Sequence, residues 1–228
     1  MQNQQPSTLK EIRVHGTQDF PCAFYQTGTR IKGNMVKHHW HEEVELLYFS
    51  GGEFCLEVNM ERFNISEECF YVINPGELHS ISVEKNGGCV ENAVVFHMDM
   101  LSSAYALDQI QTNLIQPVQN GSIQFPRCLR KNEPAFEPVR KSYEEIRNVF
   151  GGDSFRENYY DGEAVTDDIT RQLFIKSALL RILAVLSANN LFEVTEKNHD
   201  HRIETIKTTL TYIQENYKEK IYIRDLAG

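Results

Sequence analysis

Residues 33–52, GNMVKHHWHEEVELLYFSGG, carry the pattern G-x5-H-x-H-x3-E-x6-G. The three polar members of this pattern, and a histidine that follows 34 residues after the last of them, are His39, His41, Glu45 and His79. Val, Leu, Tyr, Phe and Trp are frequent from residue 36 to residue 50, and two glycines end the run. This composition predicts one β-strand that is closed by a turn.

Side chains of a strand point alternately to opposite faces of its sheet. His39, His41 and Glu45 are therefore expected to share one face with Leu47 and Phe49. The opposite face would carry three other residues: His38, Trp40 and Glu42. A polar group that is buried without a partner costs about 2 kcal/mol or more. The two imidazoles and the carboxylate consequently need a ligand, a metal ion or water.

The pattern resembles the first signature motif of the cupin superfamily, and Pro75-Gly76-x2-His79 resembles the core of the second motif. In metal-binding cupins, the two His and the Glu of the first motif and the His of the second hold the metal. The resemblance implies the same role for the four matching residues: His39, His41, Glu45 and His79. The second motif departs from the family pattern, because Pro75 and Gly76 are adjacent and the Asn expected about four residues past the His is absent.

Three uses of these four residues remain open from the sequence. Three imidazoles and a carboxylate suit Zn, Mn, Fe or Ni with open positions, as in a cupin dioxygenase, isomerase or epimerase. Without a metal, neutral imidazoles and the Glu45 carboxylate would hydrogen-bond the hydroxyls of a sugar-like effector, and no cofactor would be required. The third use is a pure assembly domain, in which the cluster is satisfied within the core.

Composition indicates ordinary globular domains, with 41% hydrophobic and 24% charged residues. No apolar run is long enough to span a bilayer, and residues 1–7 lack the features of a signal peptide, so we expect a cytoplasmic protein without membrane contact. The formal charge of −9 disfavours nucleic-acid binding by this chain alone. The five cysteines are widely spaced and are expected to be reduced.

Short strand-like runs separated by turn residues fill the first part of the chain. The expected strands are 36–49, 53–59, 62–65, 69–73, 79–83 and 90–97. Together with the resemblance, they predict a mainly β fold with α: a cupin double-stranded β-helix, or jelly-roll barrel, within residues 1–98. Residues 11–30 are expected to cover the mouth of the barrel, as an N-terminal arm does in some relatives.

Helical periodicity follows in residues 99–188, which we expect to form a dimerisation segment. The expected helices are 99–114, 135–150 and 166–188, and residues 117–134 are expected to be irregular. Thr166 would cap the last helix, with two aspartates in its first turn. This helix is apolar around more of its circumference than one barrel face would bury, so it is either an interior helix or the seam of a homodimer.

Residues 189–201 lose periodicity and form the predicted linker. Beyond it, residues 202–228 resemble the opening of the DNA-binding domain of AraC/XylS-type transcription regulators. The resemblance rests on an amphipathic helix that ends near Tyr217, followed by Asp225-Leu226-Ala227, which matches the start of the helix-turn-helix. The two helices that enter DNA grooves are not in the chain, so we expect a truncated start of this domain and no promoter binding by the fragment itself.

The order of cupin motif, apolar helix, polar linker and this C-terminal start is similar to that of AraC-type regulators. The resemblance implies a non-enzymatic sensor that binds a small, often sugar-like effector in the barrel and dimerises through the helices after it. Promoter DNA would be bound by the C-terminal domain. The effector would favour one arrangement of barrel, N-terminal segment and helices over another.

Overall fold

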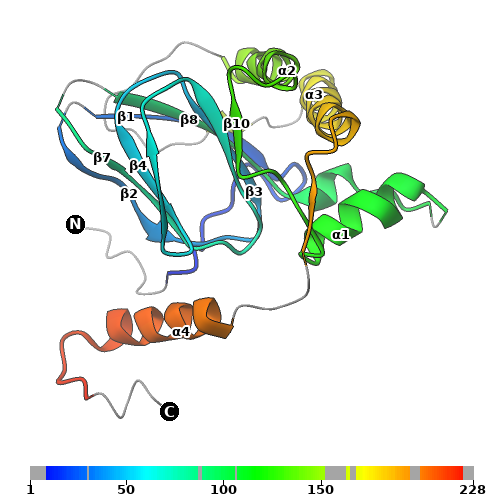
Figure 1. Cartoon of the computed structure of the whole chain (residues 1–228). Helices are drawn as coiled ribbons and strands as arrows, with labels where there is room; N and C mark the ends of the chain where they lie inside the picture. The colour runs from blue at the N-terminus through cyan, green and yellow to red at the C-terminus, as the bar shows by residue number, and fades with distance from the viewer. Residues whose placement is uncertain are drawn as a thin grey trace.

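Two antiparallel sheets face each other and form the barrel (Figure 1). The structure is a computed structural model and describes residues 9–29, 31–86, 89–105, 107–151, 163–164, 168–195 and 201–222. The six-stranded sheet has the order β10 (Cys128–Arg130), β6 (Cys69–Ile73), β3 (Val44–Phe49), β8 (Cys89–Phe96), β1 (Cys22–Thr29) and β11 (Glu163–Ala164). The four-stranded sheet has the order β2 (Gly33–His39), β7 (His79–Val83), β4 (Phe54–Val58) and β5 (Glu61–Ile65). The predicted mainly β fold with a cupin barrel is confirmed.

Strand β3 has buried side chains on both of its faces, because a core lies on each side of the six-stranded sheet. Leu47 and Phe49 point into the barrel, where they join the apolar side chains of the other sheet. Leu46 and Tyr48 point outward into a second core that the helices cover. Alternation within residues 44–49 is therefore as predicted, and both faces of the strand are removed from water.

The predicted single strand over residues 36–50 is wrong, since β2 and β3 belong to different sheets. Between them, residues 40–43 cross from one sheet to the other. Their backbone pairs elsewhere: Trp40 N donates to Leu9 O (3.0 Å), Glu11 N donates to Trp40 O (2.9 Å), and Gly76 N donates to His41 O (2.7 Å). The strand is interrupted because these hydrogen bonds satisfy groups that a continuous ladder would have used.

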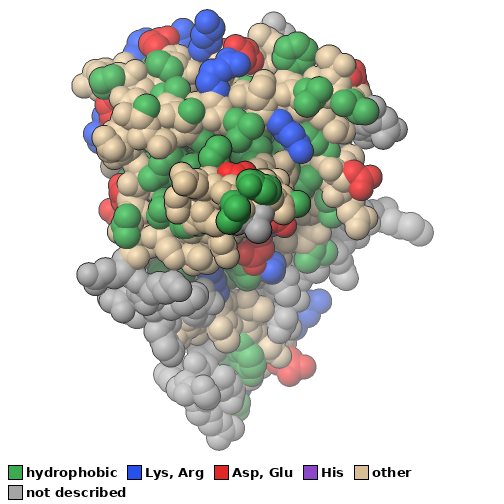
Figure 2. Space-filling model, turned by 90° about the vertical axis from the view of Figure 1, so that its right-hand side faces the viewer, with side chains coloured by type: hydrophobic (Ala, Val, Ile, Leu, Met, Phe, Trp, Pro, Cys, Tyr) green, Lys and Arg blue, Asp and Glu red, His purple; other side chains and the backbone are tan. Residues whose placement is uncertain are grey.

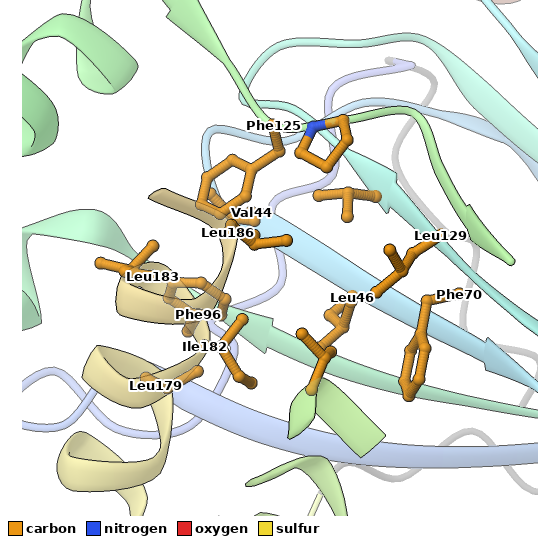
Figure 3. A pocket seen from close by; sticks show the side chains of 13 residues that line it. Val44, Leu46, Phe70, Phe96, Phe125, Leu129, Leu179, Ile182, Leu183 and Leu186 are labelled. Atoms are coloured by element: carbon orange, nitrogen blue, oxygen red, sulfur yellow. The ribbon is translucent and has the colours of Figure 1, made fainter. Parts of the chain in front are cut away.

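Helices α2 (Phe136–Val149) and α3 (Ile169–Ala188) cover the outer face of the six-stranded sheet (Figure 1). Both were predicted, although the cap of α3 is Asp168, whose carboxylate accepts from the backbone N–H of Arg171 at 3.1 Å. The predicted cap, Thr166, lies outside the described residues. Figure 3 shows the buried side of α3 against the sheet, around a residual gap of about 20 Å³. Because this gap is small and apolar, it belongs to the packing of the outer core.

The helix predicted over residues 99–114 is wrong. A 3₁₀ helix, Met98–Leu101, ends where Ser102 N donates to Asp99 O at 3.0 Å, and the chain turns away. A second helical stretch begins after Asp108, whose carboxylate accepts from Ile110 N at 2.8 Å. It continues through the π-helix Gln111–Ile115 into α1 (Gln116–Gln119). Local capping by Asp108 therefore decides where this helix starts.

The region expected to be irregular also contains the short strand β9 (Ile123–Gln124), which pairs with β12 (Glu193–Val194) inside the expected linker. Helix α4 (His201–Asn216) follows. No helix in the described ranges is long and apolar enough to cross a membrane. The described cysteine side chains are free thiols, as expected: Cys22, Cys55, Cys69 and Cys128.

Candidate functional site

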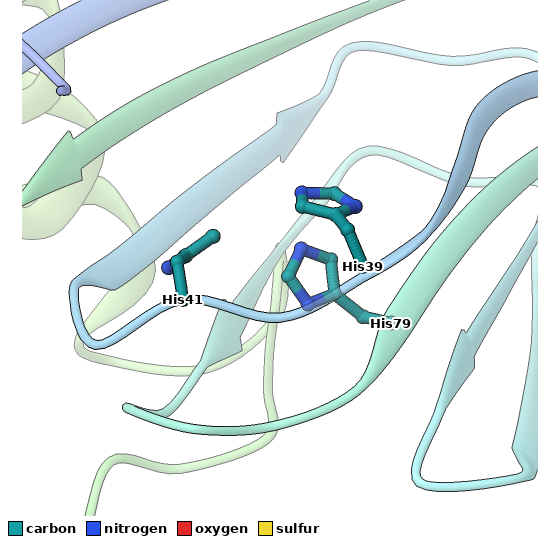
Figure 4. A group of neighbouring side chains, drawn as sticks. All are labelled: His39, His41 and His79. Carbon is teal, nitrogen blue, oxygen red and sulfur yellow. The ribbon is translucent and has the colours of Figure 1, made fainter. Parts of the chain in front are cut away.

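The candidate site lies inside the barrel, where the two sheets meet. His39 ends β2 and is paired in register with His79, the first residue of β7. His41 follows in the crossing segment, and Glu45 is on β3. Figure 4 shows the three rings turned toward one another, with centroid distances of 4.2 Å (His39 to His79), 5.1 Å (His41 to His79) and 5.6 Å (His39 to His41).

The structure brings together all four residues that the sequence singled out. Glu45 Oε2 is 3.0 Å from His79 Nε2 and 3.6 Å from His41 Nε2. Their convergence does not come from the single strand that the sequence predicted. It comes from the facing of two sheets, with the crossing segment turning His41 back toward Glu45. As predicted, His38 lies outside the cluster, where its Nε2 is 3.0 Å from the Glu57 carboxylate.

Backbone carbonyls determine the tautomer of each ring in the cluster. Nδ1 lies 2.8 Å from Lys37 O in His39, 3.2 Å from Glu43 O in His41, and 2.8 Å from Glu77 O in His79. A carbonyl oxygen can only accept, so each Nδ1 carries a hydrogen and donates it. The Nε2 lone pairs of the neutral rings are then directed into the cluster. Metal-binding histidines are commonly held in this way.

The resulting arrangement is electrostatically incomplete. Glu45 Oε2 and His79 Nε2 are buried and have no hydrogen-bond partner among the described residues, although they face each other at 3.0 Å. A carboxylate oxygen and a nitrogen lone pair repel at this distance unless a proton or a cation lies between them. The ring nitrogens of His39, His41 and His79 all lie within 4.8 Å of one another, close enough to hold one metal ion.

The pKa values in the cluster are shifted in different directions. Burial, followed by the neighbouring His79, lowers the pKa of His39 to about 4, so this ring is neutral at pH 7. Burial alone would raise the pKa of Glu45, but the neighbouring His41 and His79 rings hold it well below its usual range. Burial alone would lower the pKa of His41, but the Glu45 carboxylate raises it.

The N-terminal segment, residues 9–20, adds two site residues that the sequence reasoning missed. Glu11 Oε2 is 3.3 Å from His39 Nε2 and 3.5 Å from His15 Nε2. The hydroxyl of Tyr25 lies 2.7 Å from His15 Nδ1. Apolar residues that alternate with polar ones normally face the core, but in this segment they do not. Ile12 and Val14 are exposed and the polar residues point inward, so only the acid and the histidine four residues apart could have suggested a role.

A small cavity lies beneath this segment. Its wall includes Thr27, Val36 and Glu91 in addition to the cluster, and its volume is about 20 Å³. A cavity of this size holds one water molecule or one ion. A sugar would need several times this volume, so the arrangement seen here is closed to an effector of that size.

The loop that carries His79 is held by a polar network. Glu77 accepts from Asn74 N (2.7 Å) and pairs with both terminal nitrogens of Arg127, one of them at 2.7 Å. The Asn74 side chain in turn accepts from Phe125 N at 2.8 Å. These contacts join the second cupin motif to the segment that leads into α2. The network is largely buried, so it positions His79 rather than binding a ligand itself.

A jelly-roll barrel with histidine and carboxylate side chains converging in its interior defines a cupin-type ligand-binding domain. Residues 26–148 match the AraC-like ligand binding domain, and the chain belongs to this family. A curated relative, an uncharacterized HTH-type transcriptional regulator of Bacillus subtilis, is 25% identical over 227 residues, covering 96% of this chain and 69% of its own length. The resemblance to AraC-type regulators is thus confirmed for the ligand-binding domain.

Solved cupin structures are also similar. A predicted oxalate decarboxylase from Thermotoga maritima is 24% identical over 32% of this chain and 64% of its own, with a TM-score of 0.31. A cupin protein from Bacteroides fragilis is 14% identical over 38% of this chain and 75% of its own, with a TM-score of 0.32.

Proposed function

We propose that this chain is the effector-sensing part of an AraC-type transcription regulator and that its effector binds at His39, His41, Glu45 and His79. The family match supports a ligand-binding role. The observation that carries the choice of site is the set of buried, unpartnered atoms that face one another there, Glu45 Oε2 and His79 Nε2 among them. A ligand that supplies donors or a positive charge at this point would satisfy them.

The effector is a small molecule with several hydroxyl or carboxylate oxygens, and a sugar-like compound fits this description. It reaches the cluster when the N-terminal segment moves, because the closed cavity of about 20 Å³ has no room for it. Binding therefore favours an arrangement of the segment that differs from the closed one. This difference is the signal that a C-terminal domain would use to control promoter binding.

A divalent cation (Zn, Mn, Fe or Ni) fits the cluster in chemistry and in spacing. His39, His41 and His79 would hold it through Nε2, and Glu45 would supply the fourth ligand. When bound, such an ion acts as a Lewis acid toward an oxygen of the effector. The protein's own part is to fix the tautomers through Lys37 O, Glu43 O and Glu77 O and to exclude water.

The same proposal includes a homodimer formed through α3. Its exposed side carries large apolar groups: Ile169, Leu173, Phe174 and Leu180. Figure 2 views the molecule from the side on which α1 and α3 lie, and hydrophobic side chains reach the surface there among charged ones. A self-complementary contact between two copies would remove this apolar surface from water.

Thermal unfolding in the presence of sugars, polyols and small hydroxy acids tests the proposal. A true effector at 100 times its Kd stabilises the protein by about 2.7 kcal/mol. We expect this gain to be absent in the double variant His39→Ala, His79→Ala and retained in His38→Ala, because His38 lies outside the cluster at Glu57. An effector that stabilises the double variant as much as the wild type would contradict the proposed site.

A metal-dependent cupin enzyme is the second candidate. The observation that favours it is the directed set of three Nε2 lone pairs, which would leave coordination positions open to a substrate. Turnover of the stabilising compound by the metal-loaded protein would support this candidate. An effector recovered unchanged after prolonged incubation would support the sensor.

A further inference from the structure

Two carboxylates face the Nε2 atoms of the histidine cluster, and only one of them belongs to the cupin pattern. Glu45 reaches His41 and His79 from the six-stranded sheet. Glu11 reaches His39 from the N-terminal segment at 3.3 Å. The ligand atoms of Glu11, His15 and His41 lie within 4.8 Å of one another, so a second donor set shares His41 with the first.

His15 is placed as a ligand rather than as a packing residue. It is only 4% exposed, and its Nε2 has no hydrogen-bond partner among the described residues. The Tyr25 hydroxyl at 2.7 Å from Nδ1 fixes the ring orientation and leaves Nε2 facing Glu11. The Glu11 carboxylate lies 3.5 Å from His15 Nε2 and 3.3 Å from His39 Nε2, so one oxygen faces the free nitrogens of both rings.

Apolar contacts do not hold the middle of the N-terminal segment on the barrel. Leu9 and Phe20, near its two ends, are 3% and 1% exposed, whereas Ile12 and Val14 between them are 70% and 66% exposed. The middle of the segment presents Glu11, Arg13 and His15 to the barrel, and Arg13 lies 5.1 Å from the centre of the Tyr25 ring. Polar contacts of these side chains, together with the backbone hydrogen bonds of residues 9 and 11 to Trp40, therefore hold this part in place.

We propose that Glu11 and His15 are ligands of the divalent cation bound by the histidine cluster, so that the ion latches the N-terminal segment over the barrel. The inference rests on the metal site of the proposed function. His41 offers one free ring nitrogen to both donor sets, because its Nδ1 is engaged with Glu43 O. An ion held at this nitrogen would therefore be common to the two sets. Opening the barrel to an effector then requires Glu11 and His15 to leave the ion.

Zinc affinity, measured in competition with a chromophoric chelator, tests the donor set. We expect one Zn²⁺ per chain in the wild type and an affinity about 10- to 100-fold lower in Glu11→Gln and in His15→Gln. Glu53→Gln is the matched control, since it removes the same charge from an exposed ion pair with Lys85. The double variant His39→Ala, His79→Ala should not bind zinc at all. Thermal unfolding without metal shows that each variant is folded.

Trypsin cleavage after Lys10 or Arg13 provides a second readout that does not depend on affinity. Zinc should slow cleavage of the wild type relative to the chelator-treated protein, and it should not protect Glu11→Gln. If Glu11→Gln and His15→Gln bind zinc as tightly as the wild type, the latch is overturned while the histidine site stands. If the wild type binds no zinc, both the latch and the proposed metal site are wrong. The thermal-unfolding test with candidate effectors then decides separately whether the chain is a sensor.

Discussion

Glu91 is a buried acid inside the barrel that has no counter-charge among the described residues. Its side chain is 2% exposed, and one carboxyl oxygen has no hydrogen-bond partner there. Burial, followed by the negative charge of Glu45, raises the pKa of Glu91 well above its ordinary value of 4.5. The acid is consequently held in its protonated form in the folded barrel, where it can donate a hydrogen bond to a ligand.

The raised pKa has a defined effect on stability. Above pH 4.5 the folded state keeps the proton on Glu91, whereas the unfolded state releases it. The contribution of Glu91 to the free energy of unfolding therefore falls as pH rises from 4.5 toward the folded pKa. We expect Glu91→Gln to be more stable relative to wild type at pH 8 than at pH 5. Denaturant unfolding at both pH values measures the difference.

Glu57 provides the control for this measurement. The hydrogen bond with His38 lowers the pKa of Glu57, burial opposes this by a smaller amount, and the hydrogen bond with Arg62 lowers it further. Its contribution is therefore present above pH 4.5 and is lost only below it, so Glu57→Gln should keep nearly the same stability relative to wild type at pH 5 and pH 8. A Glu91→Gln variant with the same relative stability at pH 5 and pH 8 would contradict a protonated Glu91.

The cupin pattern made four site residues predictable because each occupies a fixed place in a motif. Glu91 and His15 have no such place. Their roles depend on how β8 and the N-terminal segment lie over the cavity, which is a tertiary property. Alternation even pointed the wrong way for Ile12 and Val14, because that segment turns its polar residues toward a polar cluster.

At the scale of elements, the loop between β6 and β7 depends on an ion pair with Arg127, which lies just before β10. Arg127 donates to Glu77 and also to Val72 O at 2.6 Å. Arg127→Met would leave the Glu77 carboxylate, which is 7% exposed, without its cation. Because Arg127 itself is partly exposed, we expect a loss of about 2 kcal/mol in the free energy of unfolding, below the range for fully buried pairs.

Arg62→Met is the matched control for Arg127→Met. It breaks a similar pair with Glu57, but Arg62 is exposed, so stability should change little. Equal losses in the two variants, measured by urea unfolding, would show that the loop does not depend on Arg127. The sequence predicted the loop as a turn but not this pair, since 50 residues separate its members.

The proposed dimer depends on the exposed apolar side of α3. Leu173 and Leu180 are two turns apart and are 61% and 43% exposed, so charges there would face each other in a self-complementary contact. We expect Leu173→Glu with Leu180→Glu to convert dimer into monomer in sedimentation analysis. Ile31→Glu, at an exposed apolar residue away from α3, should leave the dimer intact. A monomeric wild type would contradict the proposal.

The helices α2 and α3 could be predicted because the periodic apolar pattern of α2 and the acidic start and apolar run of α3 are local signals. The interruption between β2 and β3 could not, because it depends on the hydrogen bonds of Trp40 with residues 9 and 11. Sheet membership is decided by pairing between distant segments, which one short window does not contain.

At the scale of the whole molecule, α4 lies beside the rim of the site (Figure 1). The Trp40 ring, between two cluster histidines in sequence, lies 4.5 Å from Lys207 Nζ of α4 and 4.7 Å from Lys10 Nζ of the N-terminal segment. Lys207 is 8% exposed. The Trp40 ring thus contacts both α4 and the N-terminal segment. A sensor would have to couple the movements of these two segments.

Trp40→Leu keeps an apolar side chain and removes the cation–π contacts. These are worth about 0.5–1 kcal/mol at exposed sites, so amide exchange in residues 201–216 should become about two- to fivefold faster. Hydrogen-exchange mass spectrometry measures this while reporting on the barrel strands. Phe63→Leu, in the barrel wall, is the control that should leave α4 unchanged. Unchanged α4 exchange in Trp40→Leu would show that this ring does not hold the helix.

The central proposal is that the four-residue cluster inside the barrel is a ligand site whose facing lone pairs hold a divalent cation. Metal content by plasma mass spectrometry, on protein purified without a nickel column, tests it most directly. We expect close to one Zn, Mn, Fe or Ni per chain in the wild type and none in the double variant His39→Ala, His79→Ala. A wild type that carries no more metal than the double variant, and that takes up none when zinc is added, would contradict the claim.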